Sequence, residues 1–434
     1  MLSVLKNRTY RHLFIAQVIA LIGTGLATVA LGLLAYDLAG AQAGAVLGTA
    51  LAIKMVAYIG VAPIAGAFAE HLPRKAMLVS LDLVRAAVAL SLPFVTEIWQ
   101  VYVLIFVLQS ASAAFTPTFQ ATIPDILPDE REYTRALSLS RLAYDLESVI
   151  SPMLAAALLT VVSFHSLFGG TVVGFLVSAA MVVSAVLPVV VRGPKRSIYE
   201  RTTKGLRIFL HTPRLRGLLA LNLAIAAASA MVIVNTVVLV QAKLGLNQSA
   251  MAMALMAFGG GSMVVALLLP RLLERLDDRK AMLAGGAVLL AGLLVGAFVS
   301  SYSALVALWV VLGAGYSLAQ TPSGRILRRS SSAQDRPALF AAQFALSHAC
   351  WLITYPLAGW LGASVNLTAA FVGLGLLAGV AWVLSKWIWH PDYDHEVVAH
   401  QHDDLSDDHP HVAGGKSHAH SFVIDEHHRR WPRR

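Results

Sequence analysis

Charge and cysteine are both scarce in this sequence. Only 13% of its 434 residues are charged, roughly half the share found in a soluble domain, while 57% are hydrophobic. The single cysteine, Cys350, excludes a disulfide framework and a cysteine-rich metal site. The sequence also lacks a phosphate-binding loop and a nucleophile motif, so we predict neither an enzyme nor a resident cofactor. What remains is a strongly apolar chain, with a mean hydropathy of +0.69, that is typical of an integral membrane protein.

Apolar runs recur along the chain, each near the ~20 residues that a helix needs to cross a bilayer. Their number predicts an all-α membrane protein with a twelve-helix fold. The expected spans lie near residues 13–36, 44–69, 76–96, 98–119, 136–160, 166–191, 217–242, 247–270, 280–300, 302–322, 338–361 and 365–389.

Lysine and arginine collect in alternate loops, as expected when positive flanks resist translocation. If the first residue is inside, the predicted outside loops contain a single basic residue, Lys243. The first span is flanked by Lys6, Arg8 and Arg11 and has no processing site, so we expect it to remain in the membrane. We therefore predict a multi-pass protein of a bacterial inner membrane with both termini cytoplasmic. The pI of 9.7 then reflects the inside loops rather than nucleic-acid binding.

Two short patterns repeat at one offset. Glu70 and Glu274 follow the second and eighth spans, while Pro152 and Pro356 lie in the fifth and eleventh, and each pair is 204 residues apart. Such a repeat predicts two six-helix halves with the substrate near the midplane between them. The predicted units are an N-terminal half (1–191), a cytoplasmic linker (192–216), a C-terminal half (217–389) and a hydrophilic tail (390–434).

The loop after the second span resembles the loop motif of the major facilitator superfamily, Gly-x-x-x-Asp-Arg-x-Gly-Arg-Lys. It keeps Gly66, an acid at Glu70 and the pair Arg74-Lys75, but has His71 and Pro73 at two motif positions. In that family the acid and the bases latch the halves together in the outward-open state. The resemblance therefore implies a gating role for the loop residues and for those of its repeat. These residues are Gly66, Glu70, Arg74, Lys75, Glu274, Arg275 and Arg279.

A second stretch, Ser151-Pro152, is similar to the Gly-Pro signature in the fifth span of major facilitator exporters. The first glycine of that signature is replaced by serine here. The resemblance implies export as the direction of transport.

The tail is dense in histidine and interleaved with acids. Imidazole is a common ligand for Ni²⁺, Cu²⁺, Zn²⁺ and Co²⁺, and carboxylates can complete the shell. The predicted metal ligands are His395, His400, His402, His409, His411, His418, His420, His427 and His428. Polar tails of this kind are usually disordered and often have no assignable role, which is the alternative reading. The arrangement resembles the nickel-resistance permeases of the superfamily, which implies proton-driven export of Ni²⁺, with Co²⁺ as a further candidate.

Charged residues inside spans are costly and therefore mark candidate transport sites. Lys54 lies midway along the second span, and Arg141, Asp145 and Glu147 enter the fifth. Arg141 and Asp145 are four residues apart, so we favour a structural ion pair for them. Glu147 has no obvious local partner. It is the better carboxylate for a proton or a metal, or else the counter-ion of Lys54 or Arg85.

His348 is the only histidine in the middle part of a predicted span. It is either a midplane ligand or a histidine satisfied by a neighbouring hydroxyl group. Asp37 ends the first span on the outside, where it is either an exit ligand or a solvated loop acid.

Together these features predict efflux of a divalent metal ion by proton-coupled alternating access. Protons from outside would neutralise Glu147 or His348 and so favour release of the cation. The expected partners are the lipid bilayer, the divalent ion and protons, with a monomeric chain and no nucleic acid. Two alternatives stay open: export of a small organic compound such as a drug or siderophore, and a membrane-anchored metal sensor.

Overall fold

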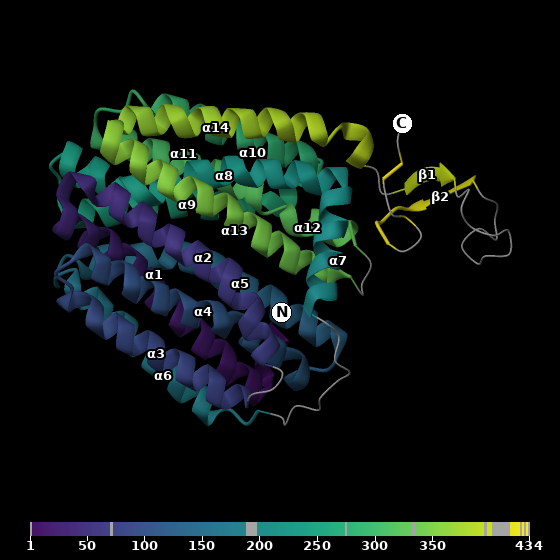
Figure 1. Ribbon diagram of the computed structural model, residues 1–434, viewed down its shortest axis with the longest axis horizontal. Helices are drawn as coiled ribbons and strands as arrows, with labels where there is room; N and C mark the ends of the chain where they lie inside the picture. Colours follow the sequence, from purple (N-terminus) through teal and green to yellow (C-terminus); the bar gives the residue numbers. More distant parts are fainter. Residues whose placement is uncertain are drawn as a thin grey trace.

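Long helices account for most of the computed structural model of the chain (Figure 1). The structure describes residues 2–69, 73–187, 198–273, 276–331, 335–394, 397–401, 417–425, 428 and 431–432. Within that part of the chain, twelve helices have eighteen or more residues.

Six of the long helices form the N-terminal half. They are α1 (Arg8–Ala39), α2 (Ala43–Ala69), α3 (Arg74–Ser91), α4 (Ile98–Ile126), α5 (Glu130–Leu158) and α6 (His165–Ser184). Short 3₁₀ turns accompany them: η1 (Leu2–Lys6), η2 (Gly40–Gln42) and η3 (Leu92–Phe94). The sharp reversal between α1 and α2 depends on Gly40, whose φ of 53° is readily accessible only without a Cβ atom.

The other six form the C-terminal half. They are α8 (Pro213–Val237), α9 (Gln248–Leu272), α10 (Asp278–Gly296), α11 (Tyr302–Gln320), α13 (Arg336–Trp360) and α14 (Leu367–Ile388). A π-helical turn extends α8 (η4, Val238–Lys243) and another extends α13 (η5, Leu361–Val365), and the short α12 (Ser323–Arg329) precedes α13. Asn247, Ser301 and Asn366 cap the first turns of α9, α11 and α14 through their side chains.

The twelve helices match the twelve predicted spans. Among the described residues, ten helical stretches are long and apolar enough to cross a membrane, and the first of them, Arg8–Val61, contains both α1 and part of α2. Helix α5 is not among the ten, and three charged residues fall in its middle turns (Arg141, Asp145 and Glu147). The chain is therefore a multi-pass membrane protein, and the predicted all-α fold is confirmed.

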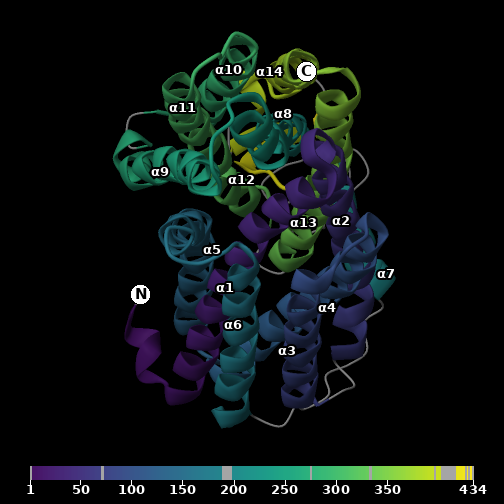
Figure 2. The same ribbon diagram turned by 90° about the vertical axis from the view of Figure 1, so that its left-hand side faces the viewer.

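The two halves lie side by side as separate bundles (Figure 2). In the N-terminal half α6 packs against α1 and α3, and in the C-terminal half α14 packs against α8 and α10. The halves meet mainly through two helix pairs, α2 with α13 and α5 with α9. In Figure 1 their helices converge at the left and diverge towards the right, where the ends of α1 and α14 that carry the chain termini lie.

Tight backbone contacts join the halves on the side opposite the termini, which we call the closed side. The first turns of α2 press against the last turns of α13, so that a Cβ atom at Gly48 would lie 2.5 Å from the carbonyl oxygen of Tyr355. Gly359 meets the backbone of Gly44 in the same region. Nearby, Gln42 Nε2 donates to the carbonyl oxygen of Ala363 at 3.2 Å. Small residues thus let the two backbones approach closely, as is usual between membrane helices.

Between the halves, the predicted linker region contains a helix, α7 (Ile198–His211). Helix α7 packs against the start of α13, where Lys204 Nζ lies 2.6 Å from Asp335 Oδ1. The connection between the halves is thus attached to the C-terminal half on the termini side.

The described part of the tail contains three short regular segments. A 3₁₀ turn, η6 (Pro391–Asp394), is followed by a two-stranded antiparallel hairpin of β1 (Val397–Gln401) and β2 (Ser417–Ser421). Phe422 and Ile424, just after β2, are buried in the apolar core, which gives this segment a reason to order.

Candidate functional site

Side chains from both halves meet in the interior of the molecule. Lys54 and Tyr58 come from α2 in the N-terminal half, and Phe344 and His348 come from α13 in the C-terminal half. The rings of Tyr58 and His348 are stacked, with centroids 5.3 Å apart and planes 7° from parallel. With Glu147 of α5, we call these five residues the central site.

His348 is held in a defined orientation within this site. Its Nδ1 lies 2.6 Å from the carbonyl oxygen of Phe344, one turn earlier on α13. Because a carbonyl only accepts, Nδ1 carries the proton of the neutral ring and Nε2 has the free lone pair. Phe344 and Tyr58 contact the imidazole ring as well. The partner of His348 is therefore a backbone carbonyl, not the hydroxyl group considered from the sequence.

Lys54 and Glu147 provide opposite charges at the central site. The ammonium group of Lys54 lies 5.7 Å from the centre of the Tyr58 ring and interacts electrostatically with the Glu147 carboxylate. Arg85, the other counter-ion considered for Glu147, is paired with Asp82 instead. Gly25 of α1 makes room for this carboxylate, since a Cβ atom there would lie 2.5 Å from Glu147 Oε1.

Three other predicted transport residues lie elsewhere or cannot be assigned contacts. Asp37 is exposed near the end of α1 on the closed side, away from the central site. Arg141 and Asp145 belong to α5, but their side chains lie outside the described residues. The ion pair predicted between them stays a prediction.

Sequence reasoning missed the aromatic members of the central site, Tyr58 and Phe344. Both lie one helical turn from a residue that the sequence did single out, Lys54 and His348 respectively. The repeat offers a further signal, because Tyr144 of α5 and His348 of α13 are also 204 residues apart.

Metal ligands are few among the described residues, which contain no group of three or more His, Cys, Asp or Glu able to hold an ion. In the central site, His348 and Glu147 are the potential ligands, and the Lys54 cation lies close to them. Such a pair would need water or backbone oxygen to complete a coordination shell.

The tail histidines are described only in part. The hairpin register pairs His400 with His418 and Val398 with His420. His428 is buried, with Nδ1 2.9 Å from Asp425 Oδ1. Five predicted ligands lie outside the described residues: His395, His402, His409, His411 and His427.

The described loop residues of the N-terminal half lie at the end of α2 and the start of α3. Gly66 is in the last turns of α2 and Arg74 begins α3, while Glu70 lies outside the described residues. Lys75 Nζ donates to the carbonyl oxygen of Ala185, the C-cap of α6, at 3.0 Å. The lysine thus satisfies one of the carbonyl groups that a helix leaves unpaired at its C-terminus.

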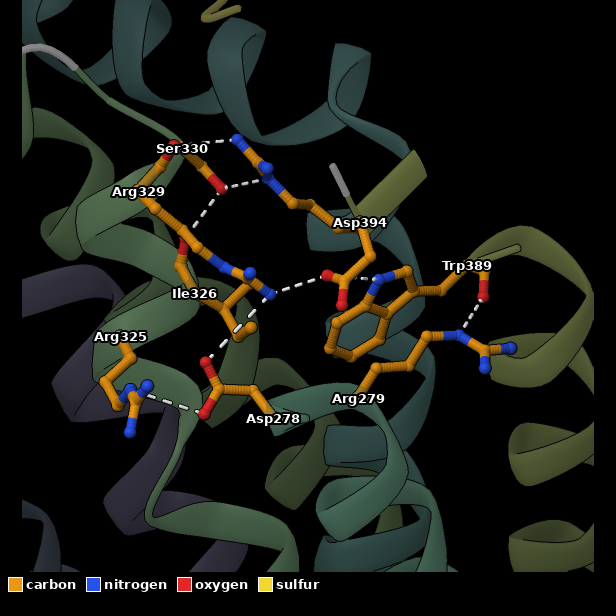
Figure 3. Close-up of polar contacts among 9 residues, drawn as sticks. Asp278, Arg279, Arg325, Ile326, Arg329, Ser330, Trp389 and Asp394 are labelled. Carbon is orange, nitrogen blue, oxygen red and sulfur yellow. Dashed lines mark hydrogen bonds and ion pairs between the residues drawn. The ribbon is translucent and has the colours of Figure 1, made fainter. Parts of the chain in front are cut away.

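The C-terminal half repeats this contact (Figure 3). Arg279 Nε donates to the carbonyl oxygen of Trp389, the C-cap of α14, at 2.5 Å. Lys75 and Arg279 are 204 residues apart, and so are Ala185 and Trp389. The repeat found in the sequence therefore extends to a hydrogen bond in the structure, although Glu274 and Arg275 lie outside the described residues.

A charge cluster surrounds the same helix end (Figure 3). Asp278 Oδ1 lies 3.3 Å from Arg325 Nε, and Asp278 Oδ2 lies 4.0 Å from a terminal nitrogen of Arg329. The same nitrogen of Arg329 is 2.5 Å from Asp394 Oδ1, which also accepts from Trp389 Nε1 at 3.2 Å. Asp394 thus ties the first turn of the tail to the base of the C-terminal half.

This architecture is that of a known transporter family. A sequence profile described as Major Facilitator Superfamily matches residues 13–275 and 218–423. The chain belongs to the Major Facilitator Superfamily. Solved structures support the fold: the nucleoside transporter NupG has a TM-score of 0.68 at 12% identity, covering 88% of this chain and 100% of NupG. An inward-facing bacterial homologue of the human lysosomal transporter Spinster also has a TM-score of 0.68, at 13% identity, covering 88% of this chain and 98% of the homologue.

Curated relatives match over shorter stretches. An uncharacterised major facilitator transporter, YfiS of Bacillus subtilis, is 29% identical over 119 residues, which is 27% of this chain and 28% of YfiS. Macrolide efflux protein A of Streptococcus pyogenes is 24% identical over 152 residues, which is 32% of this chain and 37% of that protein. The matched parts span well under half of these relatives. The activities given in their names are therefore stated for those proteins alone.

Proposed function

We propose that this chain is an efflux transporter that works by alternating access, with the central site as its binding site. One observation carries the proposal: residues of both halves meet there, through the stack of Tyr58 on His348 beside the Lys54–Glu147 charges. A ligand bound between two halves responds to their relative movement, which is the requirement for alternating access.

Export is the direction of transport that we propose. If the positive loops place both termini in the cytoplasm, the closed side corresponds to the outside of a bacterial inner membrane. The arrangement described above would then be the one that receives cargo from the cytoplasm. The Ser151-Pro152 signature and the name of the macrolide efflux relative agree with export.

For the cargo we propose a divalent transition-metal ion, with Ni²⁺ as the first candidate and Co²⁺ as the second. The histidines and acids of the tail support this choice, because they would concentrate such ions at the cytoplasmic entrance. In the central site the free lone pair of His348 Nε2 and the Glu147 carboxylate would bind the ion. A proton taken up by either group would compete for the same lone pairs and promote release.

A small organic compound is the second candidate, and a specific observation favours it. The central site contains the rings of Tyr58, Phe344 and His348 together with a lysine, a combination that suits a planar organic molecule. Lys54 would also repel a dication. The macrolide efflux relative points in the same direction.

Proteoliposomes with an imposed pH gradient separate these cargoes. We expect the purified protein to carry radioactive Ni²⁺, and we expect His348→Ala and Glu147→Gln to lose most of the flux. Ser347→Ala, at the residue before His348 on α13, is the matched control and should transport normally. A chain ending at Trp389 should transport more slowly at low Ni²⁺ but at a normal rate in excess.

Vesicles that carry a macrolide and no metal would establish the organic cargo instead. Metal binding by the tail without any flux would indicate a sensor.

A further inference from the structure

A buried ion pair lies in α3, at some distance from the loops. Asp82 has no accessible surface and Arg85 is 4% exposed, and their side chains are hydrogen-bonded to each other. Ser178 of α6 donates to the second carboxylate oxygen of Asp82 at 2.7 Å. Asp82 is eight residues from the start of α3, about 12 Å along the helix, so the pair lies well inside the membrane span.

The surroundings of Arg85 are apolar for a guanidinium group. The ring of Phe115 lies 4.2 Å from its central carbon and the ring of Phe175 lies 4.5 Å away. Its Nε has no hydrogen-bond partner among the described residues. Burying two charges in such a place costs several kcal/mol per ion before their attraction is counted. The protein therefore keeps the pair against a substantial solvation penalty.

The C-terminal half shows that the fold does not require this pair. At the same offset of 204 residues, Asp82 corresponds to Gly286, Arg85 to Leu289 and Ser178 to Trp382. The indole of Trp382 fills the space over Gly286 and donates through Nε1 to the carbonyl oxygen of Leu283 at 2.8 Å. Leu289 is fully buried. The same position in the other bundle is thus filled with apolar groups, and the charges need a different explanation.

Arg85 also connects the pair to the helices that contact the C-terminal half. Its guanidinium group packs on the ring of Phe115 in α4, and α4 packs against α2. Helices α2 and α5 are the two helices of the N-terminal half that contact α13 and α9 across the interface. Tyr58 of α2 is stacked on His348 of the C-terminal half.

We propose that Asp82 is a proton-binding site that controls the arrangement of the two halves, separate from the groups that bind cargo. While Asp82 is ionised, it holds Arg85 within the N-terminal half. When the carboxylate takes a proton from water it becomes a neutral acid, and Arg85 loses its counter-ion. The guanidinium then shifts against Phe115 of α4, and so changes how α4 packs on α2 and how α2 packs against the C-terminal half. This inference rests on the proposed proton-driven transport.

The groups that face the pair are few. Helix α6 contributes Ser178 and Phe175, and α4 contributes Phe115. The other titratable groups that influence Arg85 are Tyr58 of α2 and Tyr144 of α5. Among the described residues, Asp82 is therefore the acid that neutralises Arg85 and the group whose protonation would release it.

Distance measurements between two spin labels test the proposal without any cargo. The labels are placed at Ala76 on α3 and Arg328 on α12, both exposed on the termini side, with Cys350 replaced by alanine. We expect the distance distribution of the labelled protein to change between alkaline and acidic pH. Asp82→Asn should show the acidic distribution at every pH. Asp82→Glu, which keeps a carboxylate, should restore the pH response with a shifted midpoint.

The matched control is Asp277→Asn, which should behave like the parent. Asp277 is an exposed acid at the start of α10 whose pKa is lowered by its hydrogen bond with Lys280. If Asp82→Asn alone does not fold, the double variant Asp82→Asn/Arg85→Gln removes both charges and should also be insensitive to pH.

Two results would overturn the proposal: a parent protein whose distances ignore pH, or charge-free variants that still respond as the parent does. Failure of Ni²⁺ flux in proteoliposomes would instead count against the proposed cargo. The two failures are therefore distinguishable, because the spin-label experiment contains no metal.

Discussion

The two halves of the molecule agree at their helix ends and disagree in their interiors. On the termini side, a basic residue in the second position of α3 or α10 donates to the C-cap carbonyl of α6 or α14, through Lys75 in one half and Arg279 in the other. About two to three turns deeper, the N-terminal half contains Asp82 and Arg85, whereas the C-terminal half has Gly286 and Leu289. The two halves therefore share the polar contact at the helix end and differ in the buried ion pair, which only the N-terminal half contains.

The difference indicates which contacts the architecture needs. The last carbonyl groups of a helix have no partner within the helix and carry a partial negative charge, so a cation there is favourable in any such bundle. A buried ion pair has no comparable structural advantage over well-packed apolar groups. Contacts shared by the halves thus belong to the scaffold, and contacts found in one half are candidates for function.

The largest expected effect concerns the closed side, where the halves touch. Gly48→Val would force α2 away from the carbonyl oxygen of Tyr355, and we expect transport to fall at least tenfold because this side could no longer close. Gly60→Val is the matched control on the same helix, since a Cβ atom there meets nothing within 4 Å. Flux in proteoliposomes checks the prediction, and equal loss in both variants would mean that a general weakening of α2 is responsible.

The next largest effect is expected when α3 is given the residue found at the equivalent position of α10. Arg85→Leu gives α3 the residue found in α10 but leaves Asp82 buried and unpaired, which should reduce the free energy of unfolding by about 3–5 kcal/mol. Asp82→Ala/Arg85→Leu removes both charges and should recover most of that loss. Unfolding in mixed detergent micelles measures both variants. A double variant as unstable as the single one would show that the fold does depend on the pair.

Much of this comparison could be predicted from the sequence, because the 204-residue offset was visible in Glu70 and Glu274 and fixes every equivalent pair. The twelve spans were visible too, since apolar runs of about 20 residues mark most of them. The central site could be predicted only in part. Lys54, Glu147 and His348 are conspicuous as polar residues in apolar runs.

The rest of the central site could not be predicted, because it depends on how the halves are placed against each other. Aromatic residues are common in membrane helices, so nothing local distinguishes Tyr58 as the residue that reaches His348.

A smaller effect should be the same in both halves. Lys75→Met and Arg279→Met each remove the cation at a helix C-terminus, and each should cost about 0.3–2 kcal/mol of stability. The two sites lie in separate bundles, so we expect the costs to add in the double variant. Thermal unfolding of the three variants measures this. A large difference between the single variants would show that the repeated hydrogen bond is not equivalent in the two halves.

The smallest effect concerns a contact made by the tail with the C-terminal half. Asp394→Asn removes one charge from a partly exposed ion pair with Arg329, and such pairs contribute about 0–1 kcal/mol. Because Asp394 ties the tail to the base of α14, we expect faster hydrogen exchange in β1 and β2 but little change in the helices. Asp392→Asn, in the same turn, is the control and should leave that exchange unchanged. Unaltered exchange in Asp394→Asn would show that the buried segment after β2 holds the tail in place without help from this ion pair.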